Sequence, residues 1–316
     1  MISTIKNSIS KKIGLLVIII AIHISSHPLY SQALCSLHLD FKNSLQSERK
    51  IQEEQTFPPK ELNKDQLCLV LGTTAVSFIA LNCYLNNTYW KEGRESFYSQ
   101  EDFNRYQLMD KFGYFYLSNF MTHILSASFE SANIDFEETY IYGAVGAFLF
   151  GAYLEVRDGY SISRAFSLSD LAATTMGAAY CLSQYYLPVL KEIQPRMSYY
   201  PSNYLENDLD RGEKVTCLND LMGQKYWLSF RMENLLPENI AEYWPDFLMI
   251  SIGKGIKGEN FSNLRSDIYL AFDIDAEAIP LYGTVWQFIK NTLNYLHFPL
   301  PGIRLTNGIA AFALCY

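Results

Sequence analysis

Residues 167–190 read SLSDLAATTMGAAYCLSQYYLPVL, and the pattern of this stretch recurs through the first two thirds of the chain. A serine stands three residues before an aspartate, and 20 residues without a formal charge follow at positions 171–190. Ser167 is a good N-cap, because its hydroxyl can accept a hydrogen bond from a backbone amide in the first helical turn. The stretch therefore predicts a long apolar helix that begins on polar residues.

Three further apolar stretches come before it, at residues 67–85, 112–129 and 139–154, with 19, 18 and 16 residues. About 20 apolar residues are needed to cross a bilayer as a helix, so these stretches fall at or just below that length. In the stretches at residues 139–154 and 171–190, glycine and alanine at three- and four-residue spacing predict close helix–helix contact. The sequence thus predicts a bundle of about four helices.

The connections between the stretches differ in charge. Lysine and arginine gather in residues 86–111 and 155–170, whereas the connection after the second stretch carries only acidic charges. If the helices span a membrane, the positive-inside rule places the two basic connections in the cytoplasm and both chain ends outside. The alternative is a bundle that packs on itself or lies at a membrane surface.

Polar and ionisable residues gather where the apolar stretches begin and end. An isolated buried ion is very costly, so charges at these points must pair or line a wet cavity. Lys111 is the main cation among several carboxylates, and Arg157 is a candidate second partner. The candidate site consists of Asp110, Lys111, Tyr114, Glu155, Asp158, Ser167, Asp170 and Thr174.

We interpret this set first as a buried ionic lock between three helices. Two alternatives stay open: a binding site for a polar headgroup or sugar, and an enzyme acting on lipid or cell-wall intermediates, since crowded carboxylates shift one another's pKa. No Ser-His-Asp order, metal-ligand set or phosphate-binding loop is legible, so neither a metal nor a cofactor is expected and an enzyme is not favoured. His123 is interpreted as a hydrogen-bonded packing residue.

These residues resemble the YfiM-like family of predicted periplasmic or lipoprotein domains of unknown function and, more distantly, the VanZ-like membrane proteins. The shared elements are D-K-x-x-H, E-x-x-D and S-x-x-D-x-x-x-[DN]-x-x-G. They fall here on Asp110 and Lys111, on Glu155 and Asp158, and on Ser167, Asp170 and Gly177. Tyr114 replaces the histidine and Thr174 the acid or amide, which weakens a catalytic interpretation. The resemblance covers residues 89–190 and implies a small helical domain at a bacterial envelope.

Beyond residue 218 the apolar residues alternate with a period of two, which is typical of half-buried strands. The alternation predicts four strands, near residues 225–233, 248–252, 267–275 and 308–316. An amphipathic helix is expected before the last strand, with one apolar face made of Val285, Trp286, Ile289, Leu293 and Leu296.

The last strand ends on Tyr316, and a terminal aromatic residue also suits an outer-membrane barrel. Bacterial barrels start at eight strands, so we favour an open antiparallel sheet with one face covered by the helix or the bundle. A long unpaired edge strand would instead support a scaffold that docks another envelope protein.

The N-terminus predicts an export signal, with lysines at 6, 11 and 12, an apolar run at 14–24 and small residues near 31–33. An uncleaved anchor helix is the alternative. Cys35 follows Leu34 rather than a small residue, so we expect no lipid anchor. None of the six cysteines forms a C-x-x-C pair, which gives zinc or thioredoxin-like chemistry no support.

Composition completes the prediction. Charged residues make up 18% of the 316 residues, aromatic residues 15%, and the net charge is −8, which argues for membrane lipid and against nucleic acid as a partner. We expect an exported envelope protein of the α+β class, in an inner or outer membrane. Its parts would be a signal peptide at 1–33, a polar tether at 34–63, a helical bundle at 64–194, a linker at 195–217 and a β-rich domain at 218–316.

Overall fold

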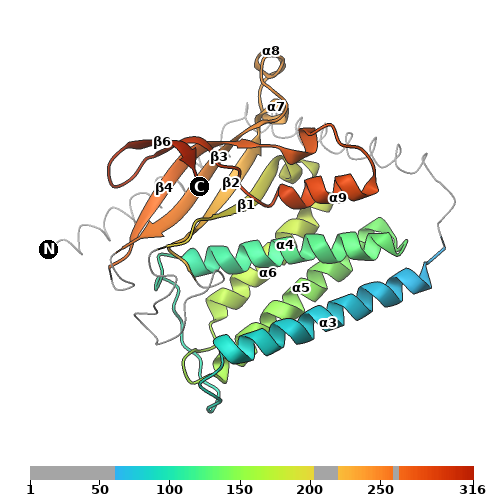
Figure 1. The fold of residues 1–316 in the computed structure, drawn as a ribbon, viewed down its shortest axis with the longest axis vertical. Coiled ribbons are helices and arrows are strands. Elements are labelled where there is room, and N and C mark those ends of the chain that lie inside the picture. The colour runs from blue at the N-terminus through green and yellow to red at the C-terminus, as the bar shows by residue number, and fades with distance from the viewer. Residues whose placement is uncertain (1–60, 203–219, 259–262) are drawn as a thin grey trace, which may run out of the picture. The chain divides into compact units, whose positions relative to one another are not determined.

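The structure is a computed structural model that describes residues 61–202, 220–258 and 263–316. The expected signal peptide and nearly all of the expected tether lie outside these residues. Residues 62–316 form one compact unit. Within it the chain runs through four long helices and then a six-stranded antiparallel sheet, so the predicted α+β class is confirmed. Figure 1 shows the arrangement of the labelled helices and strands.

The four predicted helices are present as α3 (Lys64–Thr88), α4 (Met109–Ser131), α5 (Phe136–Gly159) and α6 (Leu168–Tyr186). Ser167 caps α6 as expected, since its side chain accepts a hydrogen bond from the Asp170 amide. The last apolar stretch leaves the α-helix earlier than predicted. A short 3₁₀ helix, η1 (Pro188–Glu192), follows, because proline lacks the amide that would continue α6.

Small residues bring α4, α5 and α6 into close contact. A Cβ atom added at Gly177 would lie 2.1 Å from the Phe115 carbonyl oxygen, and one added at Gly151 would lie 2.4 Å from Thr174 Cγ2. Gly143 approaches Ser126 in the same way, at 2.3 Å from its Oγ atom. The predicted close packing of these helices is therefore confirmed.

The sheet contains six strands in the order β1 to β6 along the chain. Two of them were not predicted, namely β1 (Ile193–Tyr199) and β5 (Leu300–Arg304). The predicted strands are β2 (Gln224–Arg231), β3 (Leu248–Lys257), β4 (Arg265–Ile274) and β6 (Ala310–Cys315).

The linker prediction is wrong over residues 195–199, which belong to β1. Pro195 suggested irregular chain, but β1 is an edge strand, where a missing amide is tolerated. The alternation of apolar residues does not reveal β1 either, because this strand buries the charged side chain of Arg196, which is 0% exposed.

The sheet turns its polar face inward. Across the strands, Pro195, Leu228, Ile252, Leu270 and Ile303 pair in one row on one face. Leu228 and Ile252 in this row are 42% and 49% exposed. The neighbouring row on the opposite face holds Ser229 and Ser251, which are both 0% exposed. We expected one face of the sheet to be covered, and the fully buried row of Ser229 and Ser251 lies on the polar face.

Only one end of the apolar face is covered, and α4 covers it. Tyr226 of β2 and Ile256 of β3 form one buried cluster with Met109 and Tyr116 of α4 and with Tyr295. Tyr116 also donates a hydrogen bond of 2.9 Å to the Tyr295 carbonyl. The bundle and the sheet thus share a hydrophobic core along α4.

The predicted amphipathic helix is α9 (Thr284–Leu293), but its polar side is the buried one. Lys290 is 5% and Asn294 2% exposed, whereas Val285 is 70% exposed. Three shorter helices complete the described chain: α7 (Met232–Leu235), α8 (Glu238–Ala241) and η2 (Ala276–Ala278).

Candidate functional site

The ammonium group of Lys111 lies at the centre of the candidate site. Its Nζ atom is 2.5 Å from Asp102 Oδ1, 2.7 Å from Asp110 Oδ2 and 2.6 Å from Asp170 Oδ1. The Lys111 side chain is 8% exposed, so this charge is almost removed from water. We call these four residues the lysine centre.

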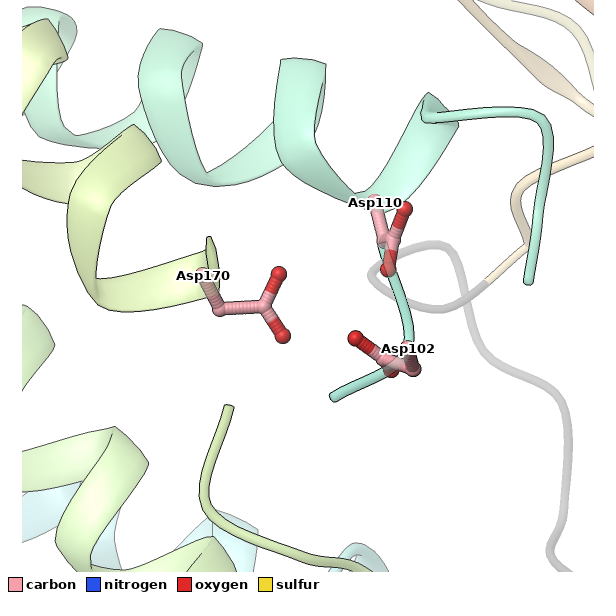
Figure 2. Close-up of side chains that lie close together, drawn as sticks. All are labelled: Asp102, Asp110 and Asp170. Carbon is pink, nitrogen blue, oxygen red and sulfur yellow. The ribbon is translucent and has the colours of Figure 1, made fainter. Parts of the chain in front are cut away.

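Three segments of the chain bring the lysine centre together. Asp110 and Lys111 lie in the first turn of α4, and Asp170 lies in the first turn of α6. Asp102 comes from the connection between α3 and α4. This connection leads into α4 through Gln107 and Leu108, whose φ angles are 54° and 69°. Figure 2 shows the three carboxylates turned toward a common point. The predicted pairing of Lys111 with Asp110 and Asp170 is therefore present.

Ser167 joins the lysine centre to Glu155. Its hydroxyl lies 3.1 Å from Asp102 Oδ1, and its amide donates a 3.1 Å hydrogen bond to Glu155 Oε2. Glu155, in the last turns of α5, is 1% exposed. Glu155 thus contacts the lysine centre through Ser167.

Asp158 belongs to a neighbouring group. Trp90 Nε1 donates a 2.6 Å hydrogen bond to Asp158 Oδ1, and Arg164 lies 3.9 Å from its Oδ2 atom. Arg157, the expected second cation, instead stacks on the Trp90 ring at 4.2 Å and donates to Asn86. The prediction for Arg157 is wrong because its helical position points it back along α5 toward α3.

Burial shifts the pKa of both inner carboxyls upward. Desolvation, followed by the charges of Asp170 and Asp158, raises the pKa of Glu155 to about 8, although the Ser167 amide and the Tyr114 hydroxyl oppose the shift. Desolvation also raises the pKa of Asp170 to about 7 against the opposing effect of Lys111. Both groups can therefore exchange protons near neutral pH.

The cation itself stays charged. Burial acts to lower the pKa of Lys111, but the hydrogen bonds that its ammonium donates to Asp102, Asp110 and Asp170 outweigh burial and raise the pKa. Burial raises the pKa of Asp110 as well. The lysine centre therefore keeps one fixed positive charge, while its Asp110 and Asp170 carboxyls are easier to protonate than usual.

Tyr114 and Thr174, the two departures from the family-like pattern, have different surroundings. Burial, then the charges of Glu155, Asp158 and Asp170, raises the pKa of Tyr114 well above its usual value, so its hydroxyl keeps its proton. Thr174 is 2% exposed and packs its methyl group against Gly151 of α5. Tyr114 can therefore only donate or accept a hydrogen bond here, and Thr174 fills space.

The carboxylates of the lysine centre also have a spacing that suits a metal ion. One oxygen from each of Asp102, Asp110 and Asp170 lies within 4.8 Å of the others. The Lys111 ammonium lies within 2.7 Å of an oxygen of each and supplies the positive charge that a cation would bring. Lysine and metal would compete for the same oxygens.

Sequence reasoning missed Asp102, Trp90 and Arg164. Asp102 lies in a charged connection, Glu101-Asp102, that resembles any exposed loop in the sequence. Asp102 pairs with Lys111 only because the connection folds back over the start of α4. Trp90 carried a signal that could have been used, because a tryptophan directly after an apolar helix often finds a polar partner for its ring nitrogen.

The sheet holds a second buried ionic network. Arg196 lies 3.0 Å and His297 Nδ1 2.7 Å from the Asp273 carboxylate, and all three side chains are 0% exposed. Ser229 and Ser251 donate to the same carboxylate rather than to the histidine. The opposite ring nitrogen of His297 faces the Cys315 carbonyl at 3.2 Å. This arrangement leaves no serine placed as a nucleophile beside the histidine.

A family model described as "Predicted periplasmic lipoprotein (DUF2279)" matches residues 97–186. The match contains the whole lysine centre and Glu155, and it stops before the sheet. It agrees with the predicted periplasmic or lipoprotein resemblance and supports a location in the cell envelope, while the YfiM-like and VanZ-like likenesses stay predictions. The expectation of no lipid anchor stays a prediction, because Cys35 lies outside the matched residues and outside the described residues. No curated protein matches the chain, and no solved structure matches it.

Other predictions on single residues can be compared with the structure. His123 packs as predicted, with its ring stacked on Tyr295 at 4.9 Å, and burial lowers its pKa to about 4. The four cysteines that the structure describes are free, with Cys181 and Cys315 buried and Cys68 and Cys83 exposed.

Two of the four long apolar helices, α3 and α5, are long and apolar enough to cross a membrane by length and composition.

Proposed function

We propose that this chain is a membrane-bound protein of the bacterial cell envelope whose lysine centre fastens one end of its helical bundle. The observation that carries the proposal is α3. This helix has 25 residues and a mean hydropathy of 1.8 over its most apolar part, of which only 6% is buried. Leu69, Val76 and Ile79 are 57%, 66% and 60% exposed. Apolar surface of this extent favours contact with lipid.

We favour a bundle that lies against the membrane over one that spans it. The sheet packs along the flank of α4, through Tyr226 and Ile256, so lipid cannot surround that helix. A spanning bundle would carry the open sheet into the hydrocarbon, together with the edge of β6 that pairs with no further strand of the described chain, and unpaired strand edges do not occur there. The exposed sides of α3 and α5 are the surfaces that can meet lipid from outside.

The charge pattern of the connections fits this arrangement. Arg157 stacks on Trp90, and Arg164 lies over the Tyr89 ring at 4.4 Å while it faces Asp158. These arginines contribute to internal contacts, so their position in the sequence need not report a cytoplasmic side. The basic connections therefore do not require a spanning topology.

Membrane fractionation tests the proposal. The expressed full chain should stay in the membrane pellet after a carbonate wash and leave it only with detergent. Val76→Asp places a charge on the exposed side of α3 and should release part of the chain. Gln100→Asp, which adds the same charge to an exposed connection, should not. Release of the unaltered chain by carbonate would overturn the proposal.

A second function is favoured by one observation, the pKa values near neutrality of Glu155 and Asp170. Such a pair could act as acid and base on a lipid or cell-wall intermediate. Glu155→Gln and Asp170→Asn distinguish this enzyme from an ionic lock. Loss of a cellular phenotype with unchanged abundance and melting temperature would support chemistry. Loss of abundance would support the lock.

A further inference from the structure

Helix α9 is attached to the protein through its polar side. Lys290 Nζ donates to the carbonyls of Glu277 and Ile279 at 3.2 and 3.1 Å. Asn294, directly after the helix, donates to Asp275 at 2.8 Å and accepts from Arg196 at 3.0 Å. These contacts fix the rotation of α9 about its own axis.

The opposite side of α9 is apolar; it faces outward in the first turns, whereas Ile289 and Leu293 further along are half-buried. Val285, Trp286 and Phe288 are 70%, 45% and 43% exposed. The segment before the helix extends this surface, because Leu281 and Tyr282 are 39% and 84% exposed. In a soluble protein an amphipathic helix buries its apolar side, so α9 has the reverse orientation.

We propose that α9 and residues 281–283 form an interfacial anchor that inserts its apolar side into one leaflet of a lipid bilayer. This inference rests on the proposed membrane-bound function and names a second contact, separate from α3. A tryptophan and a tyrosine beside aliphatic residues are the composition of helices that lie in the plane of a membrane interface.

Lipid fits this surface better than a protein partner does. The exposed apolar residues of α9 occur on one side of a single helix, and a bilayer can meet that side without complementary shape. The surface is also continuous with the helical bundle. Phe288 stacks on His123 of α4 at 6.3 Å, and α4 contacts both α9 and α3 (Figure 1).

No charge on α4 opposes insertion at this junction. His123 is the ionisable side chain of α4 beside α9, and burial lowers its pKa to about 4, so it is neutral at ordinary pH. The other group it faces is the Thr292 hydroxyl of α9, at 3.5 Å. The single cation of α9, Lys290, is turned inward onto the two carbonyls.

Tryptophan quenching in vesicles tests the anchor. The full chain is reconstituted into vesicles of phosphatidylcholine and phosphatidylglycerol in which the phosphatidylcholine is brominated near the headgroup. Trp286 should lie close to the bromine atoms, so Trp286→Phe should remove most of the quenching. Val285→Asp should also lose most of it, because a carboxylate on the apolar side is expelled from the leaflet.

Gln287→Asp is the matched control. It adds the same charge to an exposed position two residues away on α9, so its tryptophan fluorescence should be quenched as strongly as that of the unaltered chain. Equal quenching in the Val285→Asp chain would overturn the anchor but leave attachment through α3 standing. A full chain that fails to bind vesicles at all would overturn the proposed function itself. If Val285→Asp converts a dimer in detergent to a monomer with unchanged quenching, the apolar side meets a second copy and the lipid proposal is wrong.

Discussion

The pKa values of Glu155 and Asp170 are both raised, and the cause is the position of each side chain. Glu155 is enclosed at the end of α5 and faces the charges of Asp170 and Asp158. Asp170 shares Lys111, its one close cation among the described residues, with Asp102 and Asp110. One ammonium cannot neutralise three carboxylates, so part of the remaining negative charge is removed by protonation.

These shifts predict how stability depends on pH. The pKa of Glu155 is raised from 4.5 to about 8, so the folded chain keeps a proton that the unfolded chain loses above about pH 4.5. The associated stability is therefore complete below that pH and is lost as the pH rises toward 8. Denaturant unfolding of the detergent-solubilised chain should show stability falling by at most about 5 kcal/mol across this window, at roughly 1.4 kcal/mol per pKa unit.

Glu155→Gln supplies the comparison for the pH prediction. Glutamine resembles the protonated acid and cannot lose a proton, so the variant should be less sensitive to pH and more stable than the unaltered chain at pH 9. Asp170 keeps a smaller dependence in this variant, since its own pKa lies at about 7. An unchanged slope in Glu155→Gln would show that other groups cause the pH dependence.

Lys111→Met should be the most destabilising single change in the lysine centre. It removes the one charge that contacts Asp102, Asp110 and Asp170, and leaves the three carboxyls buried together. Breaking a buried ion pair by removing one partner costs about 3–5 kcal/mol. Chemical unfolding measures the loss, with exposed Lys257→Met as the control that should change little. Equal stability of both variants would rule out the ionic lock.

At the scale of elements, two glycines in helices should respond in opposite ways to alanine. Gly72 of α3 has nothing within 4 Å of an added Cβ, so Gly72→Ala should stabilise the chain by about 0.5–1 kcal/mol through helix propensity. Gly177 of α6 faces the Phe115 carbonyl at 2.1 Å, so Gly177→Ala should push α6 from α4 and cost about 1–3 kcal/mol. Melting temperatures in one detergent measure both, and a shared sign would contradict the packing.

The sequence predicted the elements better than it predicted their faces. Apolar length revealed α3 to α6, and alternation revealed β2, β3, β4 and β6, because both periods are local properties of the chain. The burial of Ser229 and Asp273 could not be predicted in this way. It depends on Arg196 and His297, which arrive from strand β1 and from the segment after α9.

The candidate site shows the same division. Asp110, Lys111 and Asp170 were predicted together because each lies at the start of a predicted helix. Asp102 was missed because its position depends on the path of the connection through Gln107 and Leu108, whose positive φ values no sequence signal announces. The sequence therefore predicted the site residues that lie at helix starts, and it missed the residue whose position depends on the path of a connection.

At the scale of the whole molecule, α4 is the element that both halves share. It contacts α5 and α6 on one side and β1, β2, β3 and α9 on the other. Residues 62–316 accordingly form one compact unit. The predicted division into a bundle and a separate β-rich domain stays a prediction, and the shared core of Tyr116, Tyr226 and Tyr295 argues against independent folding.

We therefore expect the bundle and the sheet to unfold in one transition. In increasing denaturant, hydrogen exchange of backbone amides in α5 and in β3 should converge on one opening free energy. Tyr116→Phe removes one of the two hydrogen bonds that the buried Tyr295 carbonyl accepts, the other coming from the Met197 amide, and should lower that shared value by about 0.5–1.5 kcal/mol in both elements. Tyr282→Phe, at a position 84% exposed, should leave it unchanged. If Tyr116→Phe destabilises only one of the two elements, the bundle and the sheet are separate domains, as the sequence first suggested.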